Sequence, residues 1–368
     1  MVLDLRDGSL NAICPYFTMF PLEFPHGILR RHAQANQWVL DPFCGRGTTN
    51  FASRLLGLPT IGVDSSPVAV ALSKAKLAST TPARILRAAK RILNEIERPK
   101  DVPEGEFWEM AFDKKVLRLL CRFREGLLKD SASDARLALR AILLGALHGP
   151  RAKTTSSYFS NQCPRTYAPK PRYAVKYWKK YRLYPRHVDV LGIIKTRAER
   201  YYRSQPQPAE GKILSGDSRD KELFGSINEH QFASWIITSP PYYGMRTYLP
   251  DQWLRLWFLG WEPWVEYSNE KQVEHGSPQK YASELRKVWS NVSSVSLPNA
   301  RMVIRFGGIN DRQIDVLSFI RESLRDTEWR ITTVKSAGSA SAGRRQSLHF
   351  GEDTRQPIAE YDIWAVNN

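Results

Sequence analysis

Short apolar runs alternate with helical patterns at the start of the chain. Apolar runs at residues 37–41 and 60–64 each end at an acidic residue, which is typical of strands that finish at a polar turn. Residues 48–56 and 67–77 have helical spacing, and the second of these segments opens with a proline. The order strand, glycine-rich turn, helix, strand, helix predicts the beginning of a doubly wound α/β sheet.

The pattern changes after about residue 79. Residues 84–97 and 116–147 have long helical periodicity and are rich in arginine, leucine and alanine. Residues 151–186 are basic, aromatic and punctuated by prolines, without clear periodicity, and residues 188–202 again favour a helix. These features predict a mainly helical insertion into the sheet domain.

The α/β pattern then resumes. Apolar runs at residues 212–217, 234–238 and 301–306 predict three further strands. Two runs near the end, 329–335 and 360–366, predict a closing antiparallel pair. We therefore expect one α/β fold with a mostly parallel sheet and an antiparallel strand at its C-terminal end.

The predicted domain boundaries follow from these shifts. Residues 1–80 and 211–368 form one discontinuous sheet domain, and residues 81–210 form the helical, basic and aromatic insertion. Residues 248–264 carry four tryptophans at near-helical spacing, so we expect a helix there that packs on the sheet.

Composition narrows the class of protein. The chain has 54 lysines and arginines against 37 aspartates and glutamates, a formal net charge of +17, and a polyphosphate is the commonest partner of such an excess. No apolar run is long enough to span a membrane, and residues 1–7 lack a signal-peptide pattern. The four cysteines are far apart, with no CxxC pair. We expect a soluble cytoplasmic protein in a reducing cytosol, with no membrane partner and no bound metal.

The first candidate motif follows the first predicted strand. Residues 41–49 read Asp-Pro-Phe-Cys-Gly-Arg-Gly-Thr-Thr. Gly45 and Gly47 permit close approach of a ligand, and the helix that follows offers unpaired N–H groups. Asp64, at the end of the next strand, is placed to bind ribose hydroxyls. The alternative is a tight strand-to-helix turn without a ligand.

The second candidate motif is Thr-Ser-Pro-Pro-Tyr-Tyr at residues 238–243, after an apolar strand. Two prolines fix the backbone and leave their carbonyls free of local N–H donors. The Ser239 Oγ and the Pro240 carbonyl have the types and spacing to accept both hydrogens of a base amino group, while Pro241 rigidifies the turn. Tyr242 could stack on an extruded base. The alternative is a Pro-Pro turn with aromatic core packing.

Both motifs resemble those of S-adenosylmethionine-dependent DNA amino-methyltransferases. In that family the first motif binds S-adenosylmethionine and the second is catalytic, and residues 16–21 resemble, more loosely, a motif that closes over the cofactor. The resemblance implies a Rossmann-like methyltransferase sheet, with the catalytic role at Ser239, Pro240, Pro241 and Tyr242. The residues that it assigns to the cofactor are Asp41, Phe43, Gly45, Gly47, Thr48, Asp64, Asp217 and Phe17.

Within these assignments, Asp41 would lie near the methionine amino group, Asp64 at the ribose and Asp217 at the adenine. The two turns, at 45–47 and 240–241, must lie together for methyl transfer to occur between them. Everything that the resemblance implies about the reaction depends on that juxtaposition.

Serine in the first position of the second motif is typical of cytosine-N4 enzymes, whereas aspartate or asparagine is typical of adenine-N6 enzymes. The resemblance therefore implies a site-specific methyltransferase that acts on cytosine N4 of a base flipped from duplex DNA, in a bacterial or archaeal nucleoid. Adenine-N6 methylation, methylation of a guanine amino group in RNA, and a non-catalytic nucleic-acid-binding module remain as alternatives. A restriction or defence partner is not readable from the sequence.

The best candidate for nucleic-acid contact is the stretch 164–186, where cations alternate with tyrosines. Cations neutralise phosphates, and aromatic rings stack on bases. The alternative is a basic solvated surface whose tyrosines pack on the core. The residues assigned to nucleic acid are Arg165, Lys170, Arg172, Lys176, Lys179, Lys180 and, beside the proline pair, Tyr243.

Overall fold

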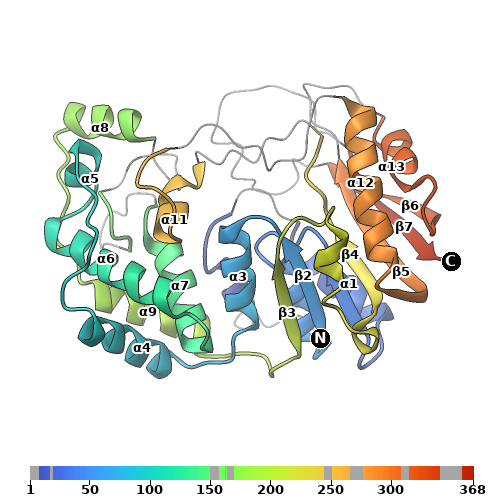
Figure 1. Ribbon diagram of the computed structural model, residues 1–368, viewed down its shortest axis with the longest axis horizontal. Coiled ribbons are helices and arrows are strands. Elements are labelled where there is room, and N and C mark those ends of the chain that lie inside the picture. The colour runs from blue at the N-terminus through green and yellow to red at the C-terminus, as the bar shows by residue number, and fades with distance from the viewer. Residues whose placement is uncertain are drawn as a thin grey trace. The chain divides into compact units, whose positions relative to one another are not determined.

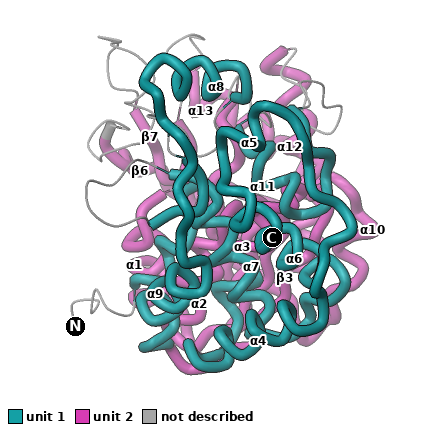
Figure 2. The backbone as a smooth tube through the Cα atoms, turned by 90° about the vertical axis from the view of Figure 1, so that its left-hand side faces the viewer, with its two compact units in different colours: residues 1–16, 74–205, 248–269 teal, residues 17–73, 206–247, 270–368 magenta. Residues whose placement is uncertain are grey.

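The structure is a computed structural model that describes residues 8–16, 20–149, 157–161, 163, 170–243, 251–265, 277–307, 315–339 and 359–368. The chain divides into two compact units (Figure 2). Unit 1 comprises residues 1–16, 74–205 and 248–269. Unit 2 comprises residues 17–73, 206–247 and 270–368.

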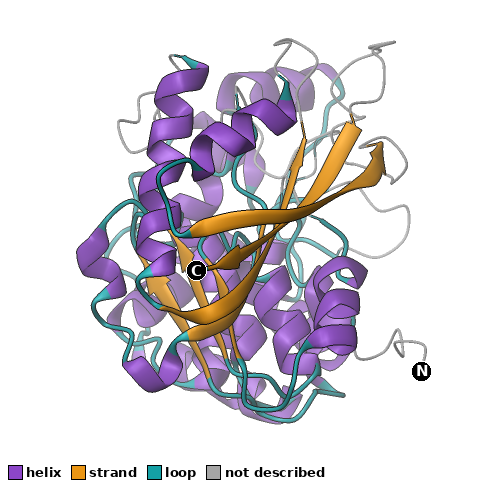
Figure 3. Ribbon diagram, turned by 90° about the vertical axis from the view of Figure 1, so that its right-hand side faces the viewer, coloured by secondary structure: helices purple, strands orange, loops and turns teal. Residues whose placement is uncertain are grey.

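Unit 2 is built on a sheet that has seven strands within the described residues, in the order β3-β2-β1-β4-β5-β7-β6 (Figures 1 and 3). The strands are β1 (Trp38–Asp41), β2 (Thr60–Asp64), β3 (Gly211–Ser215), β4 (Ala233–Thr238), β5 (Ser296–Gly307), β6 (Trp329–Ser339) and β7 (Ala359–Asn367). Strands β1 to β5 pair in parallel, and β7 is antiparallel to both β5 and β6. The predicted α/β class, with its mostly parallel sheet and antiparallel C-terminal strand, is confirmed.

The strand order reverses between β1 and β4. From β1 the chain adds β2 and then β3 on one side, whereas β4 and β5 lie on the other. Val39 pairs with Trp235 and Leu40 with Ile236 in parallel register, so β1 and β4 end at the same edge of the sheet. Ligands of open α/β sheets bind outside the carboxyl ends of the strands at such a reversal.

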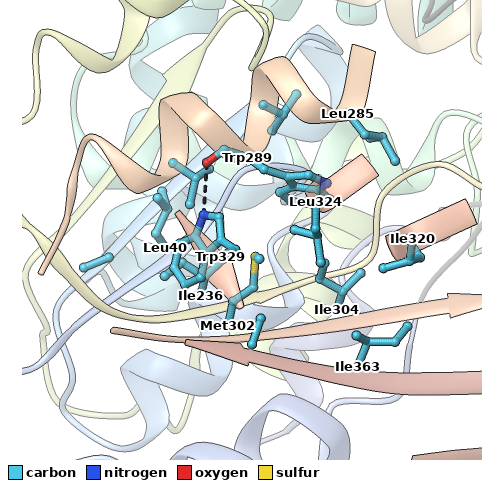
Figure 4. Packing of buried hydrophobic residues seen from close by; sticks show 14 of the residues in the cluster. Leu40, Ile236, Leu285, Trp289, Met302, Ile304, Ile320, Leu324, Trp329 and Ile363 are labelled. Carbon is cyan, nitrogen blue, oxygen red and sulfur yellow. Dashed lines mark hydrogen bonds between the residues drawn. The ribbon is translucent and has the colours of Figure 1, made fainter. Parts of the chain in front are cut away.

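A hydrophobic cluster joins the sheet to its helices (Figure 4). Trp289 and Trp329 are both buried, and the Trp329 indole N–H donates to the Trp289 carbonyl at 3.0 Å. The Trp289 indole N–H donates in turn to the Ser323 hydroxyl at 3.1 Å, so neither buried indole lacks a partner. The helices of unit 2 are α1 (Glu23–His32), α2 (Thr48–Leu55), α10 (Lys221–Phe224), α12 (Pro278–Ser293) and α13 (Val316–Leu324). Helix α3 (Pro67–Leu77) begins in unit 2 and ends in unit 1.

Unit 1 is helical in its described residues (Figure 1). Besides a 3-10 turn at Ser9–Ala12, its helices are α4 (Pro82–Glu95), α5 (Glu106–Ala111), α6 (Lys114–Lys129), α7 (Asp134–Ala146), α8 (Pro171–Lys180), α9 (Val190–Tyr202) and α11 (Trp253–Phe258). Thr81, Asp113, Ser133 and Asp189 cap α4, α6, α7 and α9 with their side-chain oxygens. No helix in the described part of the chain is both long enough and apolar enough to cross a bilayer.

The tryptophan-rich helix differs from its prediction. Helix α11 belongs to unit 1, whereas the strands of the sheet belong to unit 2. Trp253 and Trp257 contact Trp108 of α5, with ring centroids 5.7 and 4.6 Å apart. The tryptophan spacing indicated burial correctly for Trp253 and Trp257, but Trp261 and Trp264 lie beyond the helix and are exposed. Periodicity also does not say which element covers a buried face.

Candidate functional site

The glycine turn after β1 has two positions whose backbone conformation favours glycine. Gly45 has φ +51° and Gly47 has φ +74°. A Cβ on Gly47 would lie 2.9 Å from the Ser73 Cα, so the turn and the middle of α3 approach more closely than a side chain allows. The Ser73 hydroxyl donates to the Gly45 carbonyl at 2.9 Å and holds that approach. Gly47 caps α2 without a side chain, so no side chain competes for the first N–H groups of this helix.

Asp64, at the end of β2, organises the same turn. One carboxylate oxygen accepts from the Gly45 N–H at 2.8 Å, and the other accepts from the Ser66 N–H at 2.8 Å. Burial raises the pKa of Asp64 to about 6, against the opposing effect of these two hydrogen bonds. The carboxylate predicted to bind ribose is therefore also the group that fixes the backbone around it.

Asp41 joins the glycine turn to the proline turn. Its Oδ1 accepts from the Phe43 N–H at 3.1 Å and from the Thr238 hydroxyl at 2.6 Å. The side chain is 1% exposed, and this burial raises the pKa of Asp41 to about 6, although the hydrogen bond from Thr238 acts in the opposite direction. The end of β1 and the end of β4 are thus tied by one short hydrogen bond.

The proline turn carries the predicted catalytic residues. Ser239 is half-buried, and within the described residues its hydroxyl makes no hydrogen bond. The Pro241 carbonyl accepts from the buried hydroxyl of Tyr281 on α12, and Pro240 is buried. The turn is therefore held from α12, while the serine hydroxyl keeps its capacity for a ligand.

Tyr242 is anchored at both ends. Its hydroxyl donates to Oε1 of Glu360 on β7 at 2.7 Å, and its ring packs edge-on against Phe306 at 5.2 Å. Glu360 is 7% exposed. The ring orientation is thus fixed by residues far from the turn in the sequence.

Tyr243 does not lie where it was predicted. It is 6% exposed and sits 5.7 Å from Tyr281 and 6.4 Å from Phe319, between ring centroids. A side chain enclosed by aromatic neighbours in the core has no surface to offer a nucleic acid. For this tyrosine, the alternative of aromatic core packing holds.

Asp217, expected at the adenine, follows β3 and is engaged by a cation. The Arg219 side chain donates from Nε to both of its oxygens at 2.9 and 3.0 Å. Burial raises the pKa of Asp217, but the hydrogen bonds from Arg219 outweigh it and hold that pKa below its ordinary value. The neighbouring Ser218 hydroxyl donates to the Pro42 carbonyl, which brings this loop to the glycine turn.

The remaining predicted residues occupy different places. Phe43 is half-buried with its ring against Trp289 at 6.1 Å, and Thr48 is buried at the start of α2. Phe17 and Arg165 lie outside the described residues.

The predicted cations gather on one helix of unit 1. Arg172, Lys176, Lys179 and Lys180 are exposed on α8, and Lys170 is its half-buried N-cap. The Lys179 ammonium pairs with Glu106 on α5.

The sequence did not reveal the groups that hold the site. Arg219, Tyr281 and Glu360 each contact a predicted residue, yet none lies in a recognisable motif. Glu360 is separated from Tyr242 by 118 positions. Only Arg219 carried a local signal, because it lies two positions after Asp217 and is of opposite charge.

Comparison with known proteins finds similarity in the segment that contains the glycine turn. A family model described as DNA methylase, for N6 and N4 methyltransferases, matches residues 6–75, which contain the glycine turn and Asp64. Over these residues the chain is similar to the DNA amino-methyltransferases. The type II methyltransferase M.MjaII of Methanocaldococcus jannaschii is 28% identical over 103 residues, which are 28% of this chain. The match spans 19% of that methyltransferase's length.

Solved structures of methyltransferases are similar to the chain at low identity. The rRNA methyltransferase aviRa from Streptomyces viridochromogenes is 14% identical, with 99% of this chain and 94% of that chain covered and a TM-score of 0.36. An S-adenosylmethionine-dependent methyltransferase from Methanosarcina mazei is 9% identical, with 95% and 99% covered and a TM-score of 0.36.

The cofactor of the amino-methyltransferase family is S-adenosylmethionine, and the residues of unit 2 fit it chemically. The cofactor carries a cationic sulfonium, a cationic amino group and ribose hydroxyl donors, and Asp41 and Asp64 present carboxylates at the same sheet edge. The first turn of α2, which has no side-chain cap, suits an anionic carboxylate. The donor and acceptor set therefore matches the charges of the cofactor.

Proposed function

We propose that unit 2 transfers a methyl group from S-adenosylmethionine to an exocyclic amino group of a DNA base, with cytosine N4 as the substrate atom. The observation that carries this proposal is the 2.6 Å hydrogen bond from Thr238 to Asp41. It fixes the proline turn beside the glycine turn at the reversal of strand order, where a ligand of such a sheet binds.

Ser239 and Pro240 would hold the amino group. The nitrogen lone pair of a base amino group is delocalised into the ring, which makes it a poor nucleophile. Two acceptors, the Ser239 Oγ and the Pro240 carbonyl, would bind both amino hydrogens and turn the lone pair out of the ring plane. Since Tyr281 already donates to the Pro241 carbonyl, the preceding carbonyl is the acceptor that we assign to the base.

Bound S-adenosylmethionine would supply an electrophilic methyl group on its sulfonium. The chain itself would contribute position and charge: Asp41 and Asp64 on one side, Ser239 and Pro240 on the other. Preorganisation of this kind is the main source of rate when no covalent intermediate with the protein forms. The amino proton would leave after the nitrogen has become cationic, so no general base is required.

Tyr242 would stack on the face of the base once that base has left the duplex. Its ring is held by Phe306 and its hydroxyl by Glu360, so little side-chain freedom remains to be lost on stacking. Stacking of this kind would offset part of the few kcal/mol that base flipping costs.

Duplex DNA with an extruded target base is the proposed partner. The insertion predicted at residues 81–210 would carry target recognition, with Lys170, Arg172, Lys176, Lys179 and Lys180 as phosphate contacts. We propose cytosine because Ser239 occupies the position where serine is typical of cytosine-N4 enzymes.

The test is methylation of plasmid DNA by the whole chain with tritiated S-adenosylmethionine, followed by digestion to nucleosides. We expect label in N4-methylcytosine. Ser239→Ala should abolish labelling while leaving cofactor affinity, measured by calorimetry, within about twofold. Ser290→Ala on α12, whose side chain is exposed, is the matched control and should keep full activity. Full activity of Ser239→Ala would remove the role assigned to that hydroxyl.

The same digest separates the competing substrates. Label in N6-methyladenine would keep the site and change the base. A parallel reaction with transfer RNA, if it alone were labelled, would replace DNA by RNA. Failure to bind the cofactor at all would leave only a nucleic-acid-binding module.

A further inference from the structure

Helix α8 of unit 1 presents three kinds of side chain on three sides. Ala174 and Trp178, four positions apart, are buried and attach the helix to its unit. At about 100° per residue, Arg172, Lys176 and Lys180 follow one another along a second side, where Arg172 and Lys176 line a cavity with Glu106 and Phe107 of α5. Helices α5 and α8 lie next to each other in unit 1 (Figures 1 and 2).

The third side is a ladder of tyrosines. Tyr173, Tyr177 and Tyr181 recur every four residues, with ring centroids 6.3 and 4.7 Å apart along the series. Tyr173 is 49% exposed and Tyr181 53% exposed, and Tyr184, just beyond the helix, is 73% exposed. Tyrosines that served only to pack the unit would face the side of Ala174 and Trp178. These rings instead present surface to solvent beside a row of cations.

Within the stretch that carries the ladder, the charged side chains have one sign, and the acid that adjoins them is Glu106 of α5. Residues 170–186 contain seven lysines and arginines and no aspartate or glutamate. Lys179 forms an ion pair with Glu106. Within the described residues, Arg172, Lys176 and Lys180 form no ion pair. Cations at this density attract a polyanion.

We propose that α8 binds single-stranded DNA, with phosphates on Arg172, Lys176 and Lys180 and unpaired bases stacked on the tyrosine ladder. A duplex turns its base faces inward and could use only the cations, which would leave the exposed rings without a role. A single strand offers both phosphates and free base faces, and base–aromatic stacking is tolerant of sequence. DNA is favoured over RNA by the match of residues 6–75 to DNA methylases. The cations of this surface are among those proposed above as phosphate contacts, so this proposal deepens that assignment by naming a single strand as the occupant of α8; it does not depend on methyl transfer.

The experiment measures binding of the whole chain, without cofactor, to a fluorescein-labelled oligothymidine of about 20 nucleotides. A duplex of equal length and an oligouridine are the comparison ligands, and anisotropy is recorded across a salt series. We expect the oligothymidine to bind at least tenfold more tightly than the duplex. Tyr173→Ala/Tyr181→Ala should lower its affinity about tenfold per ring without changing the salt dependence. Arg172→Gln/Lys176→Gln should instead flatten the salt dependence, by about 0.7 per charge removed.

Two controls separate stacking from a loss of folding. Tyr173→Phe/Tyr181→Phe keeps both rings and should bind like the unmodified chain. Trp264→Ala removes an aromatic side chain of unit 1 that is 60% exposed but lies outside α8, and it should have no effect.

Tighter binding of the duplex, tighter binding of the oligouridine, or an unchanged affinity in the tyrosine-to-alanine variant would each overturn the proposal. Because no methyl transfer is measured, loss of this proposal would leave the proposed reaction untouched. If methyl transfer were not observed, the proposal that α8 binds single-stranded DNA would likewise be unaffected.

Discussion

The glycine turn after β1 and the proline turn after β4 end neighbouring strands, but they are held in different ways. At Gly45 the glycine turn is fixed by nearer residues, because Gly45 donates to Asp64 and Ser73 donates back to Gly45. The residues just before the turn, Asp41 and Pro42, accept from distant residues. The proline turn is fixed by distant ones, since Tyr281 donates to Pro241 and Tyr242 donates to Glu360.

This difference suits the two turns to different functions. A turn made of backbone N–H groups and positive-φ glycines presents a fixed polar surface, which suits a cofactor common to many enzymes. A turn whose orientation depends on α12 and β7 can be adjusted by changes elsewhere in the sheet domain, which suits a substrate that differs between enzymes. The comparison therefore predicts that a single substitution in the first turn has a large effect on stability and cofactor binding. In the second turn, we expect smaller effects on activity, which arise from substitutions at several distant residues.

The largest effect is expected at Gly47. Gly47→Ala combines a positive φ with a Cβ 2.9 Å from the Ser73 Cα, so either the turn or α3 at Ser73 must shift. We expect the free energy of unfolding to fall by about 3 kcal/mol and cofactor binding to be lost. Denaturant unfolding and calorimetric titration measure these two quantities.

Gly57→Ala is the matched control for Gly47→Ala. Gly57 has φ +69° and lies in the same unit, but nothing lies within 4 Å of an added Cβ. It should lose only about 1 kcal/mol and keep cofactor affinity. Equal effects of the two substitutions would mean that close packing against Ser73 does not matter.

The contrast also explains what could be predicted from the sequence. The strand, turn and helix order around Asp41 and Asp64 could be predicted because each signal is local: an apolar run, an acid, two glycines. The anchors of the proline turn could not, because the contact between Tyr242 and Glu360 requires the order of strands β4, β5 and β7 in the sheet.

The second prediction concerns Asp41, the residue that links the two turns. Its pKa is raised from 3.8 to about 6, so the folded chain holds this proton over a pH range in which the unfolded chain has lost it. The contribution of Asp41 to the free energy of unfolding must therefore fall as the pH rises from about 4 to about 6. Asp41→Asn removes this titration, and its stability relative to the unmodified chain should rise by about 2 kcal/mol across that range.

Urea unfolding of both proteins at several pH values measures the difference. Asp220→Asn, which alters an exposed N-cap of α10 in the same unit, is a control for the general effect of losing a carboxylate. A relative stability of Asp41→Asn that stays constant or falls over this range would contradict the raised pKa.

In the helices of unit 1, too, the sequence pattern predicted only part of the structure. The spacing of Tyr173, Tyr177 and Tyr181 was present in a stretch interpreted as aperiodic, because prolines and cations obscured its helical period. The pattern over residues 116–147 predicted one helix, but Asp130 to Ser133 separate α6 from α7. Ser133 caps the second helix, and the prediction from apolar periodicity did not take this N-cap into account.

The smallest effect is expected in the proline turn, at Tyr242. Tyr242→Phe keeps the ring against Phe306 and removes only the hydrogen bond to Glu360. One lost hydrogen bond to a buried carboxylate corresponds to about 1 kcal/mol, so kcat/KM for DNA should fall about fivefold while cofactor affinity stays constant. Glu360→Gln keeps an acceptor oxygen and should retain most of the activity, whereas Glu360→Leu should resemble Tyr242→Phe.

Combining Tyr242→Phe with Glu360→Leu decides whether the distant anchor acts through this bond. If it does, the double variant should be no worse than either single one, because both remove the same interaction. Additive losses would show that Glu360 acts on the site by another route, and the distinction between a locally fixed and a remotely fixed turn would then fail. Tyr242→Ala, which also removes the ring, should lose far more than fivefold, since stacking on the base is the role that we propose for the ring itself.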